Sequence, residues 1–183
     1  MKTFATQLVI GLSLAVSVGL SAAADFKVTS ADARDGRFGQ PQFAGVFGCT
    51  GGNVSPQISW SGAPAGTKSF LVSIHDRSAM TGSGWWHWVV ANIPANVSEL
   101  PHGAGSDPAK LPAGALQTLT DAGVAGYGGP CPPVGETHEY VITVKALKVE
   151  KLPLPPVATG AMTGMLSNIN SLAQASIVVK AGR

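Results

Sequence analysis

The sequence predicts an all-β domain, an antiparallel β-sandwich with long loops and one short helix near the C-terminus. The chain is rich in glycine (23 residues) and proline (13 residues), while charged residues make up only 12% of it. This composition is typical of strands joined by many turns and not of a helical bundle. Most apolar runs have the length and residue types of strands, and a single segment shows helical spacing. Two sheets packed face to face would bury these strands within one domain.

The strand predictions rest on runs of β-branched and aromatic residues between turn signals. The strongest run is Trp85–Ile93, which holds three tryptophans and ends before Pro94, since proline cannot donate to a strand ladder. The apolar segment Ser69–His75 is expected to be a central strand. Further strands are predicted at Phe26–Thr29, Gln42–Val46, Ile58–Trp60, Glu139–Val149 and Ser176–Lys180.

Two other segments complete the predicted domain. The stretch 94–136 is dense in glycine and proline without a clear element, and such stretches often form a functional surface. Residues 161–173 place apolar side chains at helical spacing, which predicts a short amphipathic helix. These side chains are Met162, Met165, Leu166, Ile169 and Leu172.

Residues 1–24 have the layout of a secretory signal peptide. A basic start is followed by the apolar run Leu8–Leu20 and then by small residues. The run is shorter than the ~20 apolar residues of a permanent membrane anchor. Cleavage is expected after Ala24, with Ala23 as the nearest competitor, and a buried N-terminal helix is the alternative. The mature domain would be residues 25–183, in the periplasm or secreted from a bacterial cell.

The charge of the chain argues against a nucleic-acid partner. The formal net charge is +2, and removing Lys2 with the leader lowers it by one to +1. Nucleic-acid binding needs clustered lysine and arginine, and the sequence shows no such cluster. Stable membrane insertion is not expected either, because no exposed amphipathic membrane helix is evident.

The chain has two cysteines, Cys49 and Cys131. Export to an oxidising compartment makes a disulfide between them the default expectation. Two buried thiols are the alternative. A zinc site is not expected, because neither cysteine has nearby ligands at a suitable spacing.

A few titratable residues stand out inside the apolar strands. Asp76 ends a predicted central strand, and His87 lies among three tryptophans. His138 and Tyr140 are two residues apart, so they share one face of a strand. Taken singly, each fits a structural role better, as a hydrogen-bonded core histidine or a core tyrosine. Composition and spacing alone therefore predict an exported all-β domain with a pocket that these residues could line.

Four segments of the chain, in order, are similar to the motifs of one known family. Residues 52–60 resemble its N-x-S-P-x-(hydrophobic)-x-W stretch, and residues 76–80 lie where it has D-P-D-A-P. Residues 81–94 resemble its W-x-H-W-(hydrophobic)-x-N-I-P strand, and residues 127–140 its Y-x-G-P-x-P-P and H-R-Y segments. On these motifs the chain resembles the phosphatidylethanolamine-binding, or Raf-kinase-inhibitor, family. Within that family, its motifs are similar to those of the bacterial YbhB/YbcL group.

The resemblance implies a Greek-key β-sandwich with a small anion pocket at one end. Histidine and tyrosine can donate hydrogen bonds to a phosphate, a carboxylate or a phospholipid head group, and histidine protonation would strengthen binding on acidification. The pocket is expected to be too small and polar for acyl chains. On the family's motifs, the ligand-binding side chains would be those of Asp76, His87, His138 and Tyr140, joined by the backbone N–H groups of Gly128 and Gly129.

Four residues depart from the family's motifs. Arg77, Ser78 and Met80 replace Pro, Asp and Pro of D-P-D-A-P, and Glu139 replaces the Arg of H-R-Y. Losing a carboxylate and gaining Arg77 would make the rim of the pocket more positive, and losing two prolines would loosen the loop. The ligand preference would then differ from that of the family.

The resulting prediction is a binding protein that is not an enzyme and uses no cofactor or metal. The alternative is an inhibitor or regulator of an extracytoplasmic protease or of another protein partner. A hydrolase using Ser78, His87 and Asp76 is a remote alternative, because the sequence has no G-x-S-x-G elbow. Asp76, His87 and His138 could hold a divalent ion, but the family pattern has no metal role. Relatives in the bacterial branch look dimeric, so the resemblance also implies a homodimer, which no residue here indicates by itself.

Overall fold

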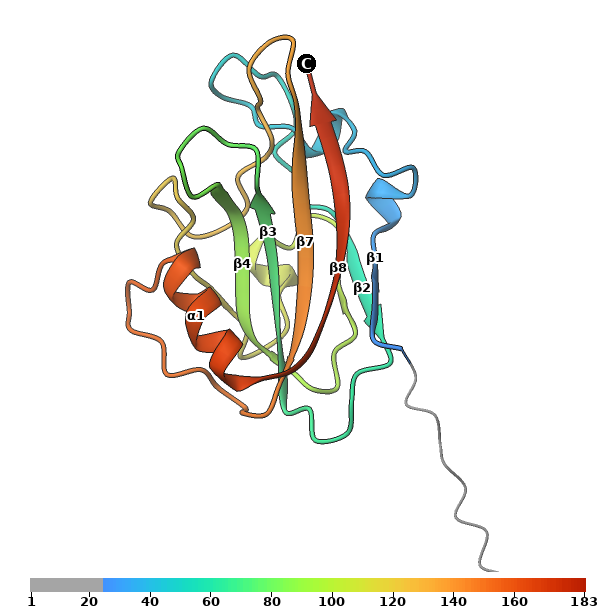
Figure 1. Ribbon diagram of the computed structural model, residues 1–183, viewed down its shortest axis with the longest axis vertical. Helices are drawn as coiled ribbons and strands as arrows, with labels where there is room; N and C mark the ends of the chain where they lie inside the picture. Colours follow the sequence, from blue (N-terminus) through green and yellow to red (C-terminus); the bar gives the residue numbers. More distant parts are fainter. Residues whose placement is uncertain (1–24) are drawn as a thin grey trace, which may run out of the picture.

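The structure is a computed structural model that describes residues 25–183. Over these residues it contains eight strands, one α-helix and three short 3-10 helices (Figure 1). The strands are β1 (Lys27–Thr29), β2 (Ile58–Ser61), β3 (Ser69–Asp76), β4 (Trp85–Pro94), β5 (Glu99–Leu100), β6 (Leu116–Gln117), β7 (Thr137–Leu147) and β8 (Ser171–Gly182). The helix is α1 (Gly160–Asn170), and the 3-10 helices are Ala31–Ala33, Gln40–Gln42 and Pro108–Lys110. The predicted signal peptide, residues 1–24, lies outside the described residues. No helix in the described part of the chain is long and apolar enough to cross a membrane.

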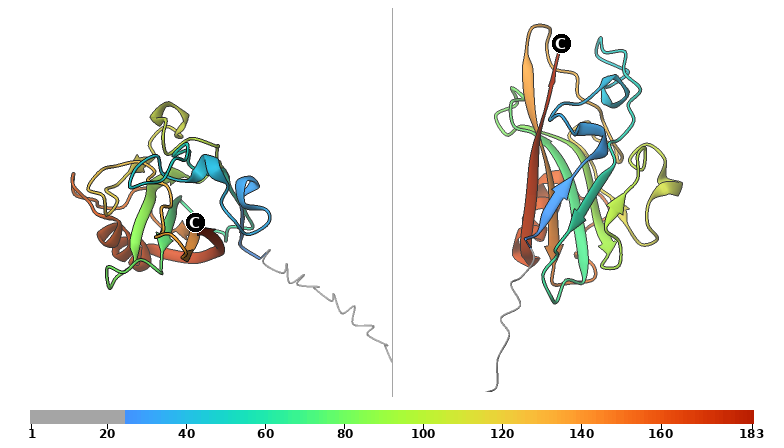
Figure 2. Two further views of the ribbon diagram at one scale, coloured as in Figure 1. Left: turned by 90° about the horizontal axis from the view of Figure 1, so that it is seen from above. Right: turned by 90° about the vertical axis from the view of Figure 1, so that its right-hand side faces the viewer.

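The strands form two antiparallel sheets that face each other as two layers (Figure 2). The larger sheet has the order β6-β4-β3-β7-β8, and the smaller has the order β1-β2-β5. The predicted antiparallel β-sandwich with one short helix near the C-terminus is confirmed. The three longest predicted strands became β3, β4 and β7, with bounds within two residues of the prediction.

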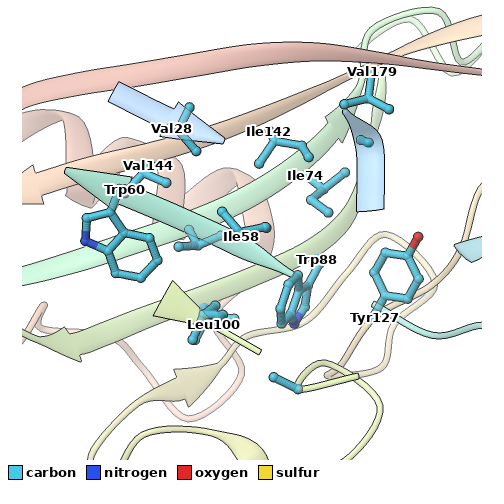
Figure 3. Close-up of a cluster of buried hydrophobic side chains, with 14 of the residues drawn as sticks. Val28, Ile58, Trp60, Ile74, Trp88, Leu100, Tyr127, Ile142, Val144 and Val179 are labelled. Atoms are coloured by element: carbon cyan, nitrogen blue, oxygen red, sulfur yellow. The ribbon is translucent and has the colours of Figure 1, made fainter. Parts of the chain in front are cut away.

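The main hydrophobic core fills the space between the sheets (Figure 3). Both layers contribute fully buried side chains, because alternate residues of each strand point inward. Burial of these apolar side chains is the main favourable contribution to folding. The core includes Ile58 and Leu100 from the smaller sheet and Ile74, Trp88, Ile142 and Val144 from the larger sheet.

One predicted strand is wrong and another is longer than predicted. In place of the strand at Gln42–Val46, a 3-10 helix covers Gln40–Gln42 and a loop follows. Phe47 and Gly48 then take left-handed backbone conformations, with φ of 55° and 78°, which extended strands do not allow. The last strand extends beyond its predicted segment, because its whole length pairs with β7.

The helix α1 lies on the outer face of the larger sheet (Figure 1), with its smallest residues toward the sheet. Gly160 and Gly164 lie against the indole ring of Trp86, and a Cβ at Gly160 would come within 2.6 Å of the ring. The helix is therefore confirmed. Leu166 packs against a buried cluster, but most of the other apolar side chains named for the helix are exposed, because the large indole leaves room only for small residues. The exposed members of that predicted face are Met162 (42%), Met165 (55%), Ile169 (63%) and Leu172 (43%), the last in β8.

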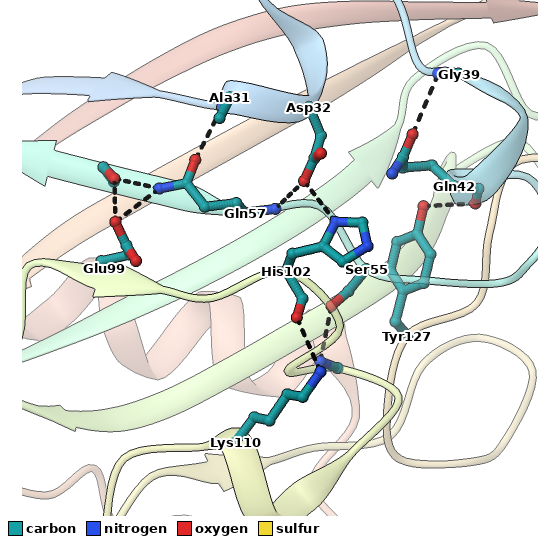
Figure 4. Close-up of polar contacts among 12 residues, drawn as sticks. Ala31, Asp32, Gly39, Gln42, Ser55, Gln57, Glu99, His102, Lys110 and Tyr127 are labelled. Carbon is teal, nitrogen blue, oxygen red and sulfur yellow. Dashed lines mark hydrogen bonds and ion pairs between the residues drawn. The ribbon is translucent and has the colours of Figure 1, made fainter.

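Hydrogen bonds between distant loops fix the surroundings of the smaller sheet (Figure 4). The carboxylate of Asp32 accepts from the backbone N–H of Gln57 at 2.7 Å and lies 2.9 Å from Nδ1 of His102. The Gln57 side chain accepts from the N–H of Ala31 at 2.8 Å and donates to Glu99 at 3.0 Å. These contacts satisfy loop backbone groups that no strand partner reaches.

The sulfur atoms of Cys49 and Cys131 are 2.09 Å apart and form the predicted disulfide. It joins the loop that carries Phe47 to the loop of residues 128–133. The hydroxyl of Tyr127 adds a second link, because it donates to the carbonyl oxygen of Gln42 at 2.9 Å. Two loops that are far apart in the sequence are thus held together at one end of the sandwich.

Candidate functional site

A buried ion pair joins Asp76 and His138 at one end of the sandwich. Nδ1 of His138 lies 2.7 Å from Oδ2 of Asp76, and Nε2 lies 3.0 Å from Oε2 of Glu136. Asp76 is 3% exposed and His138 is 7% exposed. Because an ionised carboxylate can only accept, both ring nitrogens of His138 must donate, as they do in the imidazolium form. His138 is therefore a cation held between two carboxylates.

Strand pairing and one turn bring these groups together. Asp76 is the last residue of β3 and pairs with Tyr140 of β7, so His138 lies two residues away on the same face. After the strand, the N–H of Ser78 donates to Oδ1 of Asp76 at 2.7 Å. The Ser78 hydroxyl accepts from the N–H of Glu139 at 3.1 Å. The serine at position 78 thus holds the Asp76 carboxylate in place and ties its loop to β7.

His87, on β4, has a defined tautomer. Its Nδ1 lies 2.6 Å from the carbonyl oxygen of Gly128, and a carbonyl can only accept, so Nδ1 carries the proton. Nε2 has no hydrogen-bond partner among residues 25–183, so it is the nitrogen available to a ligand. Burial lowers the pKa of His87. Near neutral pH the ring is neutral, and Nε2 becomes a donor only after protonation.

The backbone N–H groups of Gly128 and Gly129 are already used within the protein. Gly128 donates to the carbonyl oxygen of His87 at 2.9 Å, and Gly129 donates to Oδ1 of Asn53 at 2.7 Å. The prediction that these groups are available to an anion is therefore wrong for this structure. Gly129 instead permits close packing, because a Cβ there would lie 2.3 Å from the carbonyl oxygen of Gln42. Both glycines still line the cavity described below.

Tyr140 packs against both histidines of the cluster. Its ring centroid lies 5.1 Å from that of His87 and 6.5 Å from that of His138. The residue is 1% exposed. Burial and the nearby carboxylate of Asp76 raise the pKa of Tyr140, so its hydroxyl stays protonated. The tyrosine is therefore a neutral group that can donate or accept.

The pKa values of the two histidines of the cluster are shifted in opposite directions. Burial alone would lower the pKa of His138, but its hydrogen bonds to Asp76 and Glu136, and their charges, outweigh burial and raise it. For His87, burial outweighs the contribution of its carbonyl partner. Near neutral pH the cluster therefore contains two carboxylates, one imidazolium and one neutral imidazole.

A cavity of about 590 Å³ opens onto this cluster. The cavity is lined by four side chains from three different strands, those of Asp76, His87, His138 and Tyr140. These are the side chains that the sequence predicted to share one pocket. Its volume lies within the roughly 300–1,000 Å³ of small-molecule sites. The pocket is larger and more apolar than the small, polar pocket predicted from the sequence. Its exposed apolar residues are Val46 (58%), Phe47 (85%), Met80 (85%) and Val124 (61%).

Three residues of the site were not predicted from the sequence. Glu136 lies two positions before His138, a spacing that places both on one side of an extended chain and could have revealed it. Asn53 bonds Gly129 and the carbonyl oxygen of Tyr127 (at 3.1 Å), and so fixes the 127–129 loop. Phe47 gave no signal, because its place at the rim depends on its left-handed backbone and on the disulfide loop.

The arrangement can hold a bound group by hydrogen bonds and charge, but it assembles neither the hydrolase triad nor the metal site considered from the sequence. The Asp76 carboxylate bonds His138 and Nδ1 of His87 bonds a carbonyl, so Ser78, His87 and Asp76 do not form the hydrogen-bonded chain of a hydrolase triad. In the described part of the chain, no group of three or more His, Cys, Asp or Glu side chains is placed to hold a metal ion.

The fold and the motifs can be compared with known proteins. Residues 30–181 match the profile of the family described as phosphatidylethanolamine-binding protein. YbcL of Escherichia coli K12 is 48% identical over 174 residues, covering 93% of this chain and 94% of YbcL. YbhB of the same strain is 49% identical over 152 residues, covering 82% of this chain and 96% of YbhB.

The chain is also similar to one solved structure and to a mycobacterial protein. The crystal structure of E. coli YbcL, described as a new member of the mammalian family, matches with a TM-score of 0.84 at 47% identity, covering 87% of this chain and 99% of that chain. The putative lipoprotein LppC of Mycobacterium tuberculosis H37Rv is 38% identical over 115 residues, 62% of this chain and 53% of LppC. The chain described here, with its ordered motifs and its two-layered sandwich, belongs to the phosphatidylethanolamine-binding protein family.

Proposed function

We propose that the chain is an exported binding protein whose cavity holds a small phosphate, carboxylate or phospholipid head group beside Asp76, His87, His138 and Tyr140. The observation that carries this proposal is the buried charge cluster, which opens directly onto a cavity of ligand size. Even paired charges lose hydration free energy when they are buried, so the cluster is not explained by packing alone.

The charges in the cluster favour a zwitterionic head group over a plain anion. Two carboxylates and one imidazolium leave a negative balance while His87 is neutral. A bare anion close to Asp76 would be repelled, whereas an ammonium group there would be attracted. The phosphate end of the same ligand would lie against Nε2 of His87 and the hydroxyl of Tyr140. Phosphoethanolamine should therefore bind more tightly than phosphate, and phosphate more tightly than acetate.

Acidification should strengthen the binding of phosphate-bearing ligands. Nε2 of His87 accepts in the neutral ring and donates once the ring is protonated. Because burial lowers the pKa of His87, the gain should appear on the acidic side of its usual value of 6.5.

The export part of the proposal has two supports. The disulfide Cys49–Cys131 is a bond that persists in oxidising compartments and is rare in the cytosol. One relative, LppC, carries the name of a lipoprotein. Fractionation of cells expressing the full chain, with N-terminal sequencing of the product, tests export and the cleavage expected after Ala24.

The binding part is tested by calorimetric titration of residues 25–183 with phosphoethanolamine, phosphate and acetate at about pH 6 and about pH 8. The expected result is saturable binding in the stated order, stronger at the lower pH and lost in His87→Ala. His102→Ala is the matched control, because His102 pairs with Asp32 and does not line the cavity. Absence of binding at millimolar ligand would contradict the proposal.

A second candidate, a regulator of an extracytoplasmic protease or another protein, is favoured by the exposed rim. Phe47 and Met80 are each 85% exposed beside the cavity, and such side chains are common protein-contact residues. Inhibition assays against a panel of proteases test this candidate. Inhibition by the wild-type protein, and loss of that inhibition in Phe47→Ser, would support it. No inhibition at micromolar protein would oppose it.

A further inference from the structure

A second cavity, of about 550 Å³, lies on the opposite face of the larger sheet, beside α1. It shares no residue with the cavity around His87. Its polar residues are Lys145 and Asn168, together with His75, Ser83 and Asp121. Trp86, Met165 and Ile169 supply apolar surface. The proposed head-group function uses none of these side chains.

Lys145 is the unusual residue of this cavity. It is 8% exposed on β7, and its Nζ donates to the hydroxyl of Ser167 at 3.1 Å and to Oδ1 of Asn168. Both partners are neutral, and none of the ion pairs within residues 25–183 includes Lys145. A buried ammonium without a carboxylate is costly, and burial accordingly lowers the pKa of Lys145. With two of three donors used, one N–H remains for an anionic partner.

The other end of the cavity has the opposite charge. Oδ2 of Asp121 accepts from the backbone N–H of Trp86 at 2.8 Å, and the aspartate is exposed. His75 packs against Trp86 with tilted rings whose centroids are 4.3 Å apart, and its Nε2 lies 3.1 Å from the carbonyl oxygen of Ser83. Burial lowers the pKa of His75, which leaves Asp121 as the charged group at this end.

Two elements give similar lengths along the strand direction between the backbone positions at the two ends of the cavity. Lys145 pairs with Leu71 of β3, and His75 lies four residues further along that strand, or about 13 Å at 3.3 Å per residue. On the helix, Gly160 packs on Trp86 and Asn168 bonds Lys145. These two helix positions are about 12 Å apart at a rise of 1.5 Å per residue. Allowing about 3 Å for a hydrogen bond at each end, roughly 7 Å remains along the strand direction. An extended dipeptide spans this length at about 3.5 Å per residue.

We propose that this cavity binds a dipeptide-sized zwitterion, with its carboxylate on Lys145, its ammonium group on Asp121 and an apolar side chain against Trp86 and Met165. The ligand would supply the carboxylate that the buried lysine lacks. The indole and the thioether would contact the apolar side chain between the two charged ends.

The test uses the dipeptide Ala-Leu, its C-terminal amide and its N-acetyl form, titrated near neutral pH with calorimetry and amide NMR. Ala-Leu should bind saturably and shift the amide signals of Trp86 and of residues 164–169. The amide should bind about tenfold more weakly, since it loses the contact with a buried charge, and the acetylated form about threefold more weakly, since Asp121 is exposed.

Two variants that each remove one charge test which residue causes the preference for a free carboxylate and which causes the preference for a free amine. Lys145→Met, of similar length, should abolish the preference for the free carboxylate while keeping that for the free amine. Asp121→Asn, which keeps an oxygen to accept from Trp86, should do the reverse. His87→Ala is the matched control and should change neither, which separates this site from the head-group site.

Absence of saturable Ala-Leu binding at millimolar concentration would overturn the proposal. Preferences that persist in both variants would overturn it as well. Dependence on Lys145 alone would show an anion site and would reject the zwitterion. Circular dichroism of each variant confirms that the protein tested is folded.

Discussion

Nδ1 of His138 lies 2.7 Å from Oδ2 of Asp76, and this contact joins β3 to β7 at the floor of the candidate site. Glu136 approaches the opposite nitrogen of the same ring at 3.0 Å. The pair determines both the protonation of His138 and the charge that a ligand would meet.

Asp76→Asn should lower the pKa of His138, because the ring loses its buried charge partner and keeps only the half-exposed Glu136. The loss of a charged hydrogen bond should also cost about 2 kcal/mol of stability. Histidine NMR titration and urea unfolding measure the two effects. Glu136→Gln is the matched control and should lower the same pKa less. An unchanged pKa of His138 in Asp76→Asn would show that the pair does not set its protonation.

The free energy of unfolding should pass through a maximum near pH 6.5, the usual pKa of histidine. The pKa of His138 is raised, so its contribution is complete below 6.5 and is lost as pH rises through the folded-state pKa. The pKa of His87 is lowered, so its contribution is complete above 6.5 and is lost as pH falls through the folded-state pKa.

Urea unfolding between about pH 5 and about pH 8 measures this profile. His138→Gln should remove the decline on the alkaline side. His87→Gln should reduce the decline on the acidic side, and His75, whose pKa burial also lowers, accounts for the remainder. A wild-type profile that rises steadily across the range would be incompatible with the assigned directions.

Removing the disulfide should destabilise the protein and weaken the cavity. The bond closes a separation of 82 residues, for which the chain-entropy relation gives about 4.5 kcal/mol. The double variant Cys49→Ala, Cys131→Ala should lose stability on this scale and bind phosphoethanolamine less tightly, because the loop with Phe47 is released from the 128–133 loop. Unfolding with and without reductant gives the same comparison in the wild type. Equal midpoints would mean that the bond does not stabilise the fold.

Two glycines of α1 should respond to alanine in opposite ways. At Gly160 a Cβ would lie 2.6 Å from Trp86, so Gly160→Ala should cost about 1–3 kcal/mol through overpacking. At Gly164 the nearest ring atom would be 3.6 Å away, an ordinary contact, so Gly164→Ala should stabilise the helix by up to about 1 kcal/mol. Thermal unfolding of the two variants tests the pair. Equal effects would contradict the packing of α1 on Trp86.

The sheet strands were predictable because local pattern and burial agree in them. The runs at Ser69–Asp76 and Trp85–Pro94 are mostly buried, and their residue types favour extended backbone. The loop at Phe47 was not predictable, because its left-handed conformation follows from contacts with distant segments. The outward-facing methionines of α1 were likewise not predictable, since the size of Trp86, on another element, decides which helix face is buried.

The residues of the candidate site could be predicted from the sequence, but the contacts between them could not. The motifs indicated Asp76 and His138, but their contact depends on the register between β3 and β7. The sequence could not reveal that Asn53 occupies the N–H of Gly129, because 76 residues separate the two. The apolar rim was missed for the same reason, since its residues come from separate loops.

Head-group binding beside the cluster is tested by following the side-chain ¹⁵N signals of the four histidines while phosphoethanolamine is added to residues 25–183. If the head group binds beside the cluster, Nε2 of His87 changes from a lone-pair nitrogen toward a protonated one, while Nδ1 keeps its proton. His102, on the Asp32 side of the molecule, should not change. Saturable shifts at His87 that leave His102 unchanged would support binding of the head group at this cavity. Signals of His87 that stay constant to millimolar ligand would contradict it.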